Sequence, residues 1–249
     1  MKIIVVYDNR TLDPNLVSGW GFSCLVDNDL IFDTGGDSRT LLSNMEKMGI
    51  DVEGIKTVVL SHAHGDHTGG LGGLLATGIR PTVYVPCSFP ARFKADVRSL
   101  TTLVEVREPM KIRPAVHTTG EVGSRLVEQA LAVETDEGLV VITGCAHPGV
   151  VEMVRRAQEV AGGRTPPRIG GAGGGGVYLV LGGFHLGGVG RRQVGRIITD
   201  FRRLGVRKVA PCHCTGDRAI RIFAEEYGED FIRVGAGCAI TIGPEERGL

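Results

Sequence analysis

Short apolar runs alternate with amphipathic stretches along most of the chain, and this alternation predicts strands and single helices in turn. Runs of β-branched and aromatic residues, bounded by Asn, Asp or Gly, predict strands at residues 2–7, 20–26, 29–32, 57–60, 82–85, 129–134, 139–143, 177–181, 206–210, 231–234 and 239–242. Apolar residues at helical spacing predict helices at residues 38–48, 71–76, 150–160, 191–204 and 219–227. Strand-rich blocks and helices recur in both halves, which favours an α/β architecture of two packed sheets with helices outside.

Two segments lack this order. Residues 86–123 contain scattered prolines and no sustained period, and we expect a lid over a site or an irregular connection there. Residues 162–176 are dominated by glycine, which predicts a flexible surface loop. Strands resume on each side of this loop, so we expect one domain over residues 1–249.

The bulk composition narrows the class of protein. The chain has 249 residues, of which 42% are apolar and 22% charged, and its formal net charge is zero. A neutral chain is a poor candidate for a general nucleic-acid or membrane-surface binder. Its first residues lack the length and cleavage site of a signal peptide, its apolar runs are too short to span a membrane, and its six cysteines form no CxxC pair. We therefore expect a cytoplasmic protein with reduced cysteines.

The stretch HAHGDH, residues 62–67, places three histidines and one aspartate directly after an apolar run. His62 and His64 are two residues apart, so both rings project to one side of an extended segment. Asp66 and His67 follow where the chain turns. Imidazole and carboxylate together suit zinc, manganese or iron. The motif predicts a metal site, and a polar turn with coincidental histidines is the alternative.

Three later histidines also follow apolar strands and stand among small residues. Sites are commonly built from loops at such positions. We predict that His147 and His213 are further metal ligands, although His147 also precedes a proline that favours a helix start. His185 is a candidate for substrate binding or catalysis, and His117 is expected at the surface.

These motifs resemble a known family. HAHGDH after a strand, FDTG at residues 32–35 and PCHCTG at residues 211–216 resemble the metallo-β-lactamase superfamily. The resemblance implies a four-layer αβ/βα sandwich with a dinuclear metal site at the edge of its sheets. It also implies that His62 and His64 hold one ion with a later histidine. Asp66, His67 and His213 would hold the other ion, and Asp33 would orient the motif loop without binding metal.

The chain departs from the superfamily pattern at ITGCAHPG, residues 142–149. Many members have a metal-bridging aspartate here, and this chain has Cys145. We infer that His147 supplies an imidazole, and that Cys145 is a small buried residue beside the ligands, with thiolate ligation as the alternative. The segments YDN, SGWGFSCLV, GCAHPG, GGFHL and HCTG together are similar to the dihydropteroate-synthase-like subgroup, to which an archaeal dihydropterin synthase belongs.

The favoured function is a metal-dependent hydrolase with two divalent ions, zinc first and manganese or iron as alternatives. A metal-activated water would attack a phosphate-containing small-molecule ester. Asp66 would take part in catalysis as well as ligation, and His185 would bind a phosphate or protonate a leaving group. Arg92 and Lys94 are weaker candidates for binding the substrate phosphate.

Three alternatives remain. The subgroup resemblance implies a transferase that condenses a dihydropterin diphosphate with an aminobenzene ribose phosphate. A di-iron redox protein is another, although such proteins carry more carboxylate ligands than this chain offers. A nuclease could use Arg192, Arg196 and Arg203 on one helix face, but a solvated charged face explains them more simply. The oligomeric state is left open.

Overall fold

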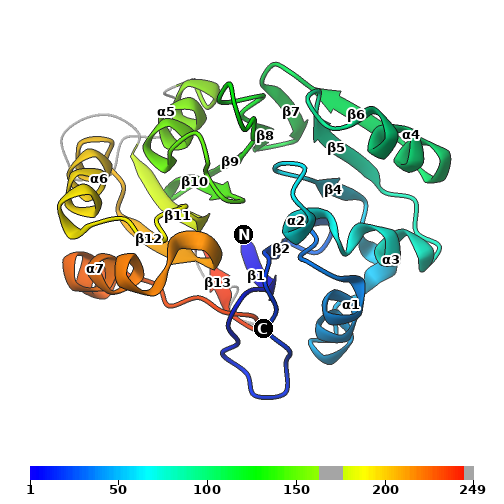
Figure 1. The fold of residues 1–249 in the computed structure, drawn as a ribbon, viewed down its shortest axis with the longest axis horizontal. Helices are drawn as coiled ribbons and strands as arrows, with labels where there is room; N and C mark the ends of the chain where they lie inside the picture. The colour runs from blue at the N-terminus through cyan, green and yellow to red at the C-terminus, as the bar shows by residue number, and fades with distance from the viewer. Residues whose placement is uncertain (163–175, 244–249) are drawn as a thin grey trace.

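The computed structural model describes residues 1–162 and 176–243, so the predicted glycine-rich loop lies almost entirely outside the described residues. Two sheets pack face to face (Figure 1). The strand order of the first is β13 (Ala239–Thr241), β1 (Lys2–Tyr7), β2 (Ser23–Val26), β3 (Leu30–Phe32), β4 (Thr57–Val59), β5 (Thr82–Pro86) and β6 (Leu103–Val106). That of the second is β12 (Lys208–Cys212), β11 (Val177–Gly183), β10 (Gly138–Thr143), β9 (Leu131–Thr135), β8 (Val116–Thr118) and β7 (Met110–Arg113).

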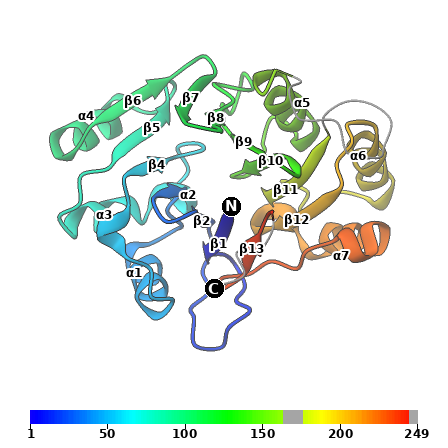
Figure 2. The ribbon, with the colours of Figure 1, turned by 180° about the vertical axis from the view of Figure 1, so that it is seen from behind.

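Helices cover the outer face of each sheet (Figures 1 and 2). Over the first sheet lie α1 (Ser38–Lys47), α3 (Leu71–Ala76) and α4 (Ala91–Leu100). Over the second lie α5 (Val150–Val160), α6 (Arg191–Arg203) and α7 (Asp217–Tyr227). The short helix α2 (Gly65–Thr68) and 3₁₀ turns at Val52–Gly54, His213–Thr215 and Gly228–Asp230 complete the described elements. This arrangement is the four-layer αβ/βα sandwich that the sequence predicted.

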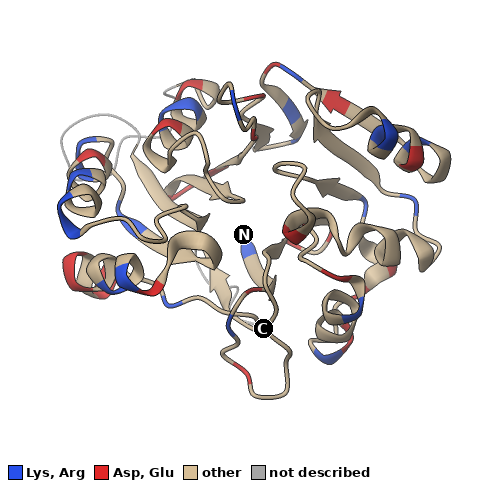
Figure 3. Cartoon of the chain, in the orientation of Figure 1, with Lys and Arg blue, Asp and Glu red and all other residues tan. Residues whose placement is uncertain are grey.

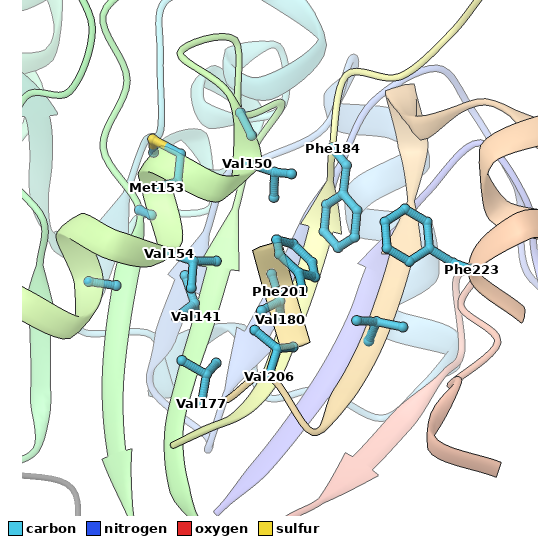
Figure 4. Packing of buried hydrophobic residues seen from close by; sticks show 14 of the residues in the cluster. Val141, Val150, Met153, Val154, Val177, Val180, Phe184, Phe201, Val206 and Phe223 are labelled. Atoms are coloured by element: carbon cyan, nitrogen blue, oxygen red, sulfur yellow. The ribbon is translucent and has the colours of Figure 1, made fainter. Parts of the chain in front are cut away.

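Three apolar clusters hold the layers together. The central cluster fills the space between the sheets, where Ile3 and Phe32 of the first meet Ile142 and Leu181 of the second. A second cluster lies between the second sheet and its helices, with Phe184, Phe201 and Phe223 at its centre (Figure 4). A third lies under α1, α3 and α4. Because side chains alternate along a strand, each sheet supplies apolar residues to both of its faces.

Charged side chains are concentrated on the outer helices and on loops (Figure 3). Lys and Arg are interspersed there with Asp and Glu, as in the ion pairs Arg191–Glu225 and Arg156–Glu159. Among the described residues, no helix has both the length and the apolar character needed to cross a membrane.

Two expectations about local structure were wrong. Residues 86–123 are not an irregular segment, since they contain α4 and the strands β6, β7 and β8. These strands are only three or four residues long, and β6 and β7 lie at sheet edges with mostly half-exposed side chains, so their sequences lack a clear apolar period. Residues 231–234 do not form a strand, because only Phe231 bridges to Val209 before the chain leaves the sheet.

Parallel strands set the position of the site. β3, β4, β5 and β6 run parallel to one another, as do β10, β11 and β12. Parallel strands end at the same edge of a sheet, and ligands of open α/β sheets bind outside these carboxyl ends. The candidate histidines follow β4, β10, β11 and β12.

Candidate metal centre

Four residues that follow strands have left-handed backbone conformations. The φ angles of Asp33, Ala146, His185 and His213 are 55°, 58°, 50° and 49°. Residues other than glycine adopt this region rarely, at a cost of about 1–3 kcal/mol, and such residues cluster at functional sites. The surrounding structure therefore forces the chain to turn sharply as it leaves β3, β10, β11 and β12.

The first group of converging side chains consists of His62, His64 and His147. Nε2 of His62 lies 3.0 Å from Nδ1 of His64. The ring centroid of His147 lies 4.9 Å from that of His62 and 5.0 Å from that of His64. His62 is buried, whereas His64 is exposed, so the group opens to solvent on one side.

Hydrogen bonds fix which nitrogen of each ring faces the group. Nδ1 of His62 lies 2.9 Å from the hydroxyl of Ser61. Nδ1 of His147 contacts Oε1 of Glu128, a fully buried carboxylate that also accepts the backbone N–H groups of Ala146 and His147. A histidine whose Nδ1 is held by such a partner presents Nε2 as a ligand atom.

The second group consists of Asp66, His67 and His213. Oδ2 of Asp66 lies 3.7 Å from Nε2 of His67 and 3.3 Å from Nε2 of His213. His213 Nε2 is buried and has no hydrogen-bond partner among the described residues. Buried polar atoms are nearly always paired, so this nitrogen points to a missing partner.

The second group is oriented in the same way as the first. Nδ1 of His67 lies 2.7 Å from Oδ2 of Asp33, which also accepts the hydroxyl of Ser61 at 2.7 Å. Nδ1 of His213 lies 3.0 Å from Oδ1 of Asn9. Asp33 thus contacts the motif loop and one histidine, and both of its oxygens are engaged by Ser61 and His67.

Cys145 lies between the two groups. Its Sγ atom is 3.2 Å from Nε2 of His67. Three sets of residues have ligand atoms within 4.8 Å of one another. They are Asp66, His67, Cys145 and His213; His62, Cys145 and His147; and Cys145, His185 and Cys214. We expected Cys145 beside the ligands, and the structure places its sulfur among the atoms of every one of these sets.

The charge states in the site favour cation binding. Burial, together with the neighbouring histidines, lowers the pKa of His62 to about 2, so this ring is neutral. Burial also lowers the pKa of His213. Burial raises the pKa of Asp66, but the His213 side chain, 3.3 Å away, and the charge of His67 outweigh it and hold the pKa below its usual range. The pKa of His67 is raised despite burial by the carboxylates Asp33, Asp66 and Glu128, which shows that this position favours a positive charge.

The other predicted site residues lie at different distances from these groups. The His185 ring is exposed at the rim, and its centroid lies 4.2 Å from that of His147. Arg92 and Lys94 lie on α4, where they pair with Asp96 and Glu105, and no recorded contact joins them to the histidines among the described residues.

Sequence reasoning missed three residues of the site. Glu128 had no local signal, because it follows an irregular segment and acts through a tertiary contact. Asn9 and Cys214 stand in motifs that the sequence did present, YDN and HCTG, but their contacts with His213 and Cys145 required the fold.

The residues present fit a pair of divalent metal ions. Ring nitrogens converge in two clusters, and the buried Nε2 of His213 forms no hydrogen bond with a described residue. Each ligand ring other than His64 is held through its Nδ1 atom. Imidazole, carboxylate and thiol groups are ligands that zinc and other divalent transition-metal ions take in proteins.

Comparison with known proteins gives the same family as the motifs. A family model described as "Metallo-beta-lactamase superfamily" matches residues 25–156, just over half of the chain. A curated relative from Methanocaldococcus jannaschii, 7,8-dihydropterin-6-methyl-4-(beta-D-ribofuranosyl)-aminobenzene-5'-phosphate synthase, is 29% identical, and the alignment covers 84% of this chain and 82% of that protein. An uncharacterized protein of the same organism is 26% identical over 88% of this chain and 92% of its own length.

Solved structures share the fold. The crystal structure of Tm1679, described as a metal-dependent hydrolase of the beta-lactamase superfamily, is 29% identical with a TM-score of 0.79, covering 98% of this chain and 100% of that one. Human tRNase Z, short form, has a TM-score of 0.63 over 98% of this chain and 100% of its own. At 13% sequence identity, this similarity concerns the fold alone.

Proposed function

Because the chain belongs to the metallo-β-lactamase superfamily, we propose that it is a metal-dependent hydrolase that acts on a phosphate-containing ester. The observation that carries this proposal is the convergence of histidine ring nitrogens beside Asp66 and Cys145, above all the buried Nε2 of His213, which forms no hydrogen bond with a described residue and faces the Asp66 carboxylate. The relative described as a metal-dependent hydrolase, which this chain covers in full, supports it.

Two sets of residues would hold the ions. His62, His64 and His147 would bind the first, and Asp66, His67 and His213 would bind the second. Two divalent ions at such a site lower the pKa of bound water and polarise the ester under attack. Zinc is the proposed metal, since these ligands are imidazoles with one carboxylate and the thiol of Cys145 lies beside both sets.

The chain's own residues would position the water and the substrate. Asp66 stays ionised, so it can accept a hydrogen bond from the water while it ligates, but its low pKa prevents it from keeping the proton. The pKa of His185 is lowered by burial and by the charge of His147, so its ring is neutral and can donate one N–H to a phosphate oxygen at the rim. His64 and His185 are exposed, which leaves the site open to water in the free protein.

We further propose that Cys145 binds metal as a thiolate in the place of the bridging aspartate. Its sulfur belongs to the candidate ligand sets on both sides, which supports this role. Cobalt(II)-loaded protein should show thiolate-to-cobalt charge-transfer absorption. Cys145→Ser should lose that absorption, and Cys145→Asp should keep two ions without it. Cys87→Ser, at a free cysteine outside these sets, serves as the control. An unchanged spectrum in Cys145→Ser would refute the thiolate.

The hydrolase proposal is tested by metal analysis together with a panel of phosphomonoesters, phosphodiesters, thioesters and lactams. We expect two zinc ions per chain and phosphoesterase activity that a chelator removes and zinc restores. His213→Ala should abolish it, whereas His117→Ala should not, because His117 pairs with Glu134 outside the candidate sets. Activity that resists complete metal removal would contradict the proposal.

A second candidate is transfer, which the name of the curated synthase favours. The same residues would then bind a dihydropterin diphosphate, and the acceptor would be an aminobenzene ribose phosphate. Incubation with both compounds separates the two reactions. Diphosphate release that requires the acceptor supports transfer, whereas ester cleavage without any acceptor supports hydrolysis.

A further inference from the structure

A cavity of about 250 Å³ lies beside His213, separate from the rim at His185. One wall is the β1–β2 loop, residues 8–22, which projects from the body of the molecule (Figure 1). The opposite walls come from the end of β12, the first turns of α7 and residues 231–234. Of the site residues predicted from the sequence, His213 alone lines this cavity.

Hydrogen bonds hold the loop wall in place. Backbone bonds join Leu12 N to Ala236 O at 2.9 Å and Ala236 N to Arg10 O at 2.8 Å. On the other side, the buried amide of Asn44 contacts the backbone of Val6 and Val17. The cavity is therefore formed before any ligand arrives, as small-molecule sites usually are.

The lining combines an exposed aromatic face with positive charge. Trp20 is 64% exposed, and its ring centroid lies 5.1 Å from that of His213. Arg10 is paired with Asp217, but Arg233 is exposed and forms no ion pair with any other described residue. A large exposed aromatic residue in a pocket marks a binding surface, and a guanidinium without an ion pair can bind the oxygens of a carboxylate or phosphate in pairs.

The acidic groups of the cavity are already engaged. Oδ1 of Asp8 accepts the backbone N–H of Arg10 at 3.1 Å, and Oδ2 accepts that of His213 at 3.0 Å. Asp217 is occupied by Arg10. Arg233 is the charged side chain of the lining without an ion pair or side-chain hydrogen bond to another described residue, so its guanidinium is available to an anion.

We propose that this cavity binds an aryl phosphate, with the ring against Trp20 and the phosphate on Arg233. The ligand would lie next to His213, and through Asn9 next to the hydrogen bond that orients that histidine. Its assignment as a subsite for the substrate rests on the proposed function, whereas the binding itself does not depend on metal.

Trp20 is the only tryptophan in the chain, so its fluorescence reports directly on this cavity. The experiment titrates the protein with phenyl phosphate and with phenol, once loaded with zinc and once with chelator present. We expect saturable quenching by phenyl phosphate in both states, displacement by inorganic phosphate, and much weaker binding of phenol. If the protein shows no metal-dependent activity but still binds phenyl phosphate, the proposed function is overturned and the binding proposal stands.

The variants separate Arg233 from charge in general. Arg233→Met should weaken phenyl phosphate binding on the order of tenfold, the usual effect of losing a hydrogen bond to a charged group. Arg233→Lys should retain part of the affinity. Arg196→Met removes an exposed arginine of α6 and should bind like wild type. Equal binding of phenol, quenching only in the metal-loaded state, or wild-type affinity in a folded Arg233→Met would overturn the proposal.

Discussion

Substitution of Glu128 by Gln isolates the contribution of one buried carboxylate to metal binding. Glu128 accepts two backbone N–H groups, from Ala146 at 2.8 Å and His147 at 3.0 Å, and contacts Nδ1 of His147. Although burial raises its pKa, the hydrogen bonds from the side chain and the backbone of His147 outweigh it and hold the pKa at about 2, so Glu128 is ionised at neutral pH. Glutamine keeps the shape but replaces one accepting oxygen with a donor.

In either orientation of the new amide, its NH₂ group faces an N–H donor that Glu128 accepted. If its NH₂ group faces Ala146 N–H, one buried donor loses its partner at a cost of about 1–3 kcal/mol. If the NH₂ group faces His147, the ring must accept at Nδ1 and carry its proton on Nε2, the atom proposed to bind metal. Loss of a carboxylate that supports a ligand histidine lowers metal affinity by about 10–100-fold, which corresponds to about 1.4–2.7 kcal/mol.

The assay is a zinc titration against a competing chelator, paired with urea denaturation of the metal-free protein. We expect one of two binding steps to weaken in Glu128→Gln and the other to change little. Glu134→Gln is the matched control, since Glu134 pairs with His117 at 3.0 Å at a half-exposed position. A stably folded Glu128→Gln protein with two unchanged binding steps would refute the reasoning.

Three further predictions concern stability. Gly72→Ala should raise the free energy of unfolding by about 0.4–1 kcal/mol, because a Cβ there meets nothing within 4 Å. Gly73→Ala should lower the free energy of unfolding, because its Cβ would lie 2.1 Å from Cβ of Ser38. The urea denaturation midpoints of the two variants should therefore shift in opposite directions. Asp37→Ala removes the N-cap bond to Thr40 and the bond from Tyr7, and should cost about 1–2 kcal/mol at neutral pH. Burial raises the Asp37 pKa, but these bonds outweigh it and lower the pKa, so the stabilisation should be present above the unfolded value and fade as pH falls below it; equal acid limbs in variant and wild type would contradict this. Asn44→Ala should cost about 1–3 kcal/mol and speed hydrogen exchange at Val17, whose N–H it leaves unpaired, whereas unaltered exchange would show that the loop does not depend on Asn44.

The sequence allowed much of the layer order to be predicted. The strand at residues 2–7 and the helix at residues 150–160 were predicted correctly. Apolar residues recur in each at the spacing of its own secondary structure. The prediction that His147 and His213 join the HAHGDH loop followed from their positions directly after apolar strands, where sites are commonly built, and from the family resemblance.

What could not be predicted depends on contacts between distant segments. β6, β7 and β8 are stabilised by strand pairing toward the end of each sheet. Their short sequences of apolar and polar residues give no periodic signal that predicts this pairing. Glu128 and Asn9 act only through histidines 19 and 204 residues away. The placement of Cys145 between two groups likewise required the distances.

The two ligand groups are completed at different moments of synthesis. Glu128 is made before His147, so every member of the first group, with its support, exists once the chain has passed α5. The second group waits for His213, and β1 waits still longer for its partner β13. We therefore expect a nascent chain to be able to hold one ion long before it can hold two, so that metal supply during translation influences how the second half of the sandwich closes over the first.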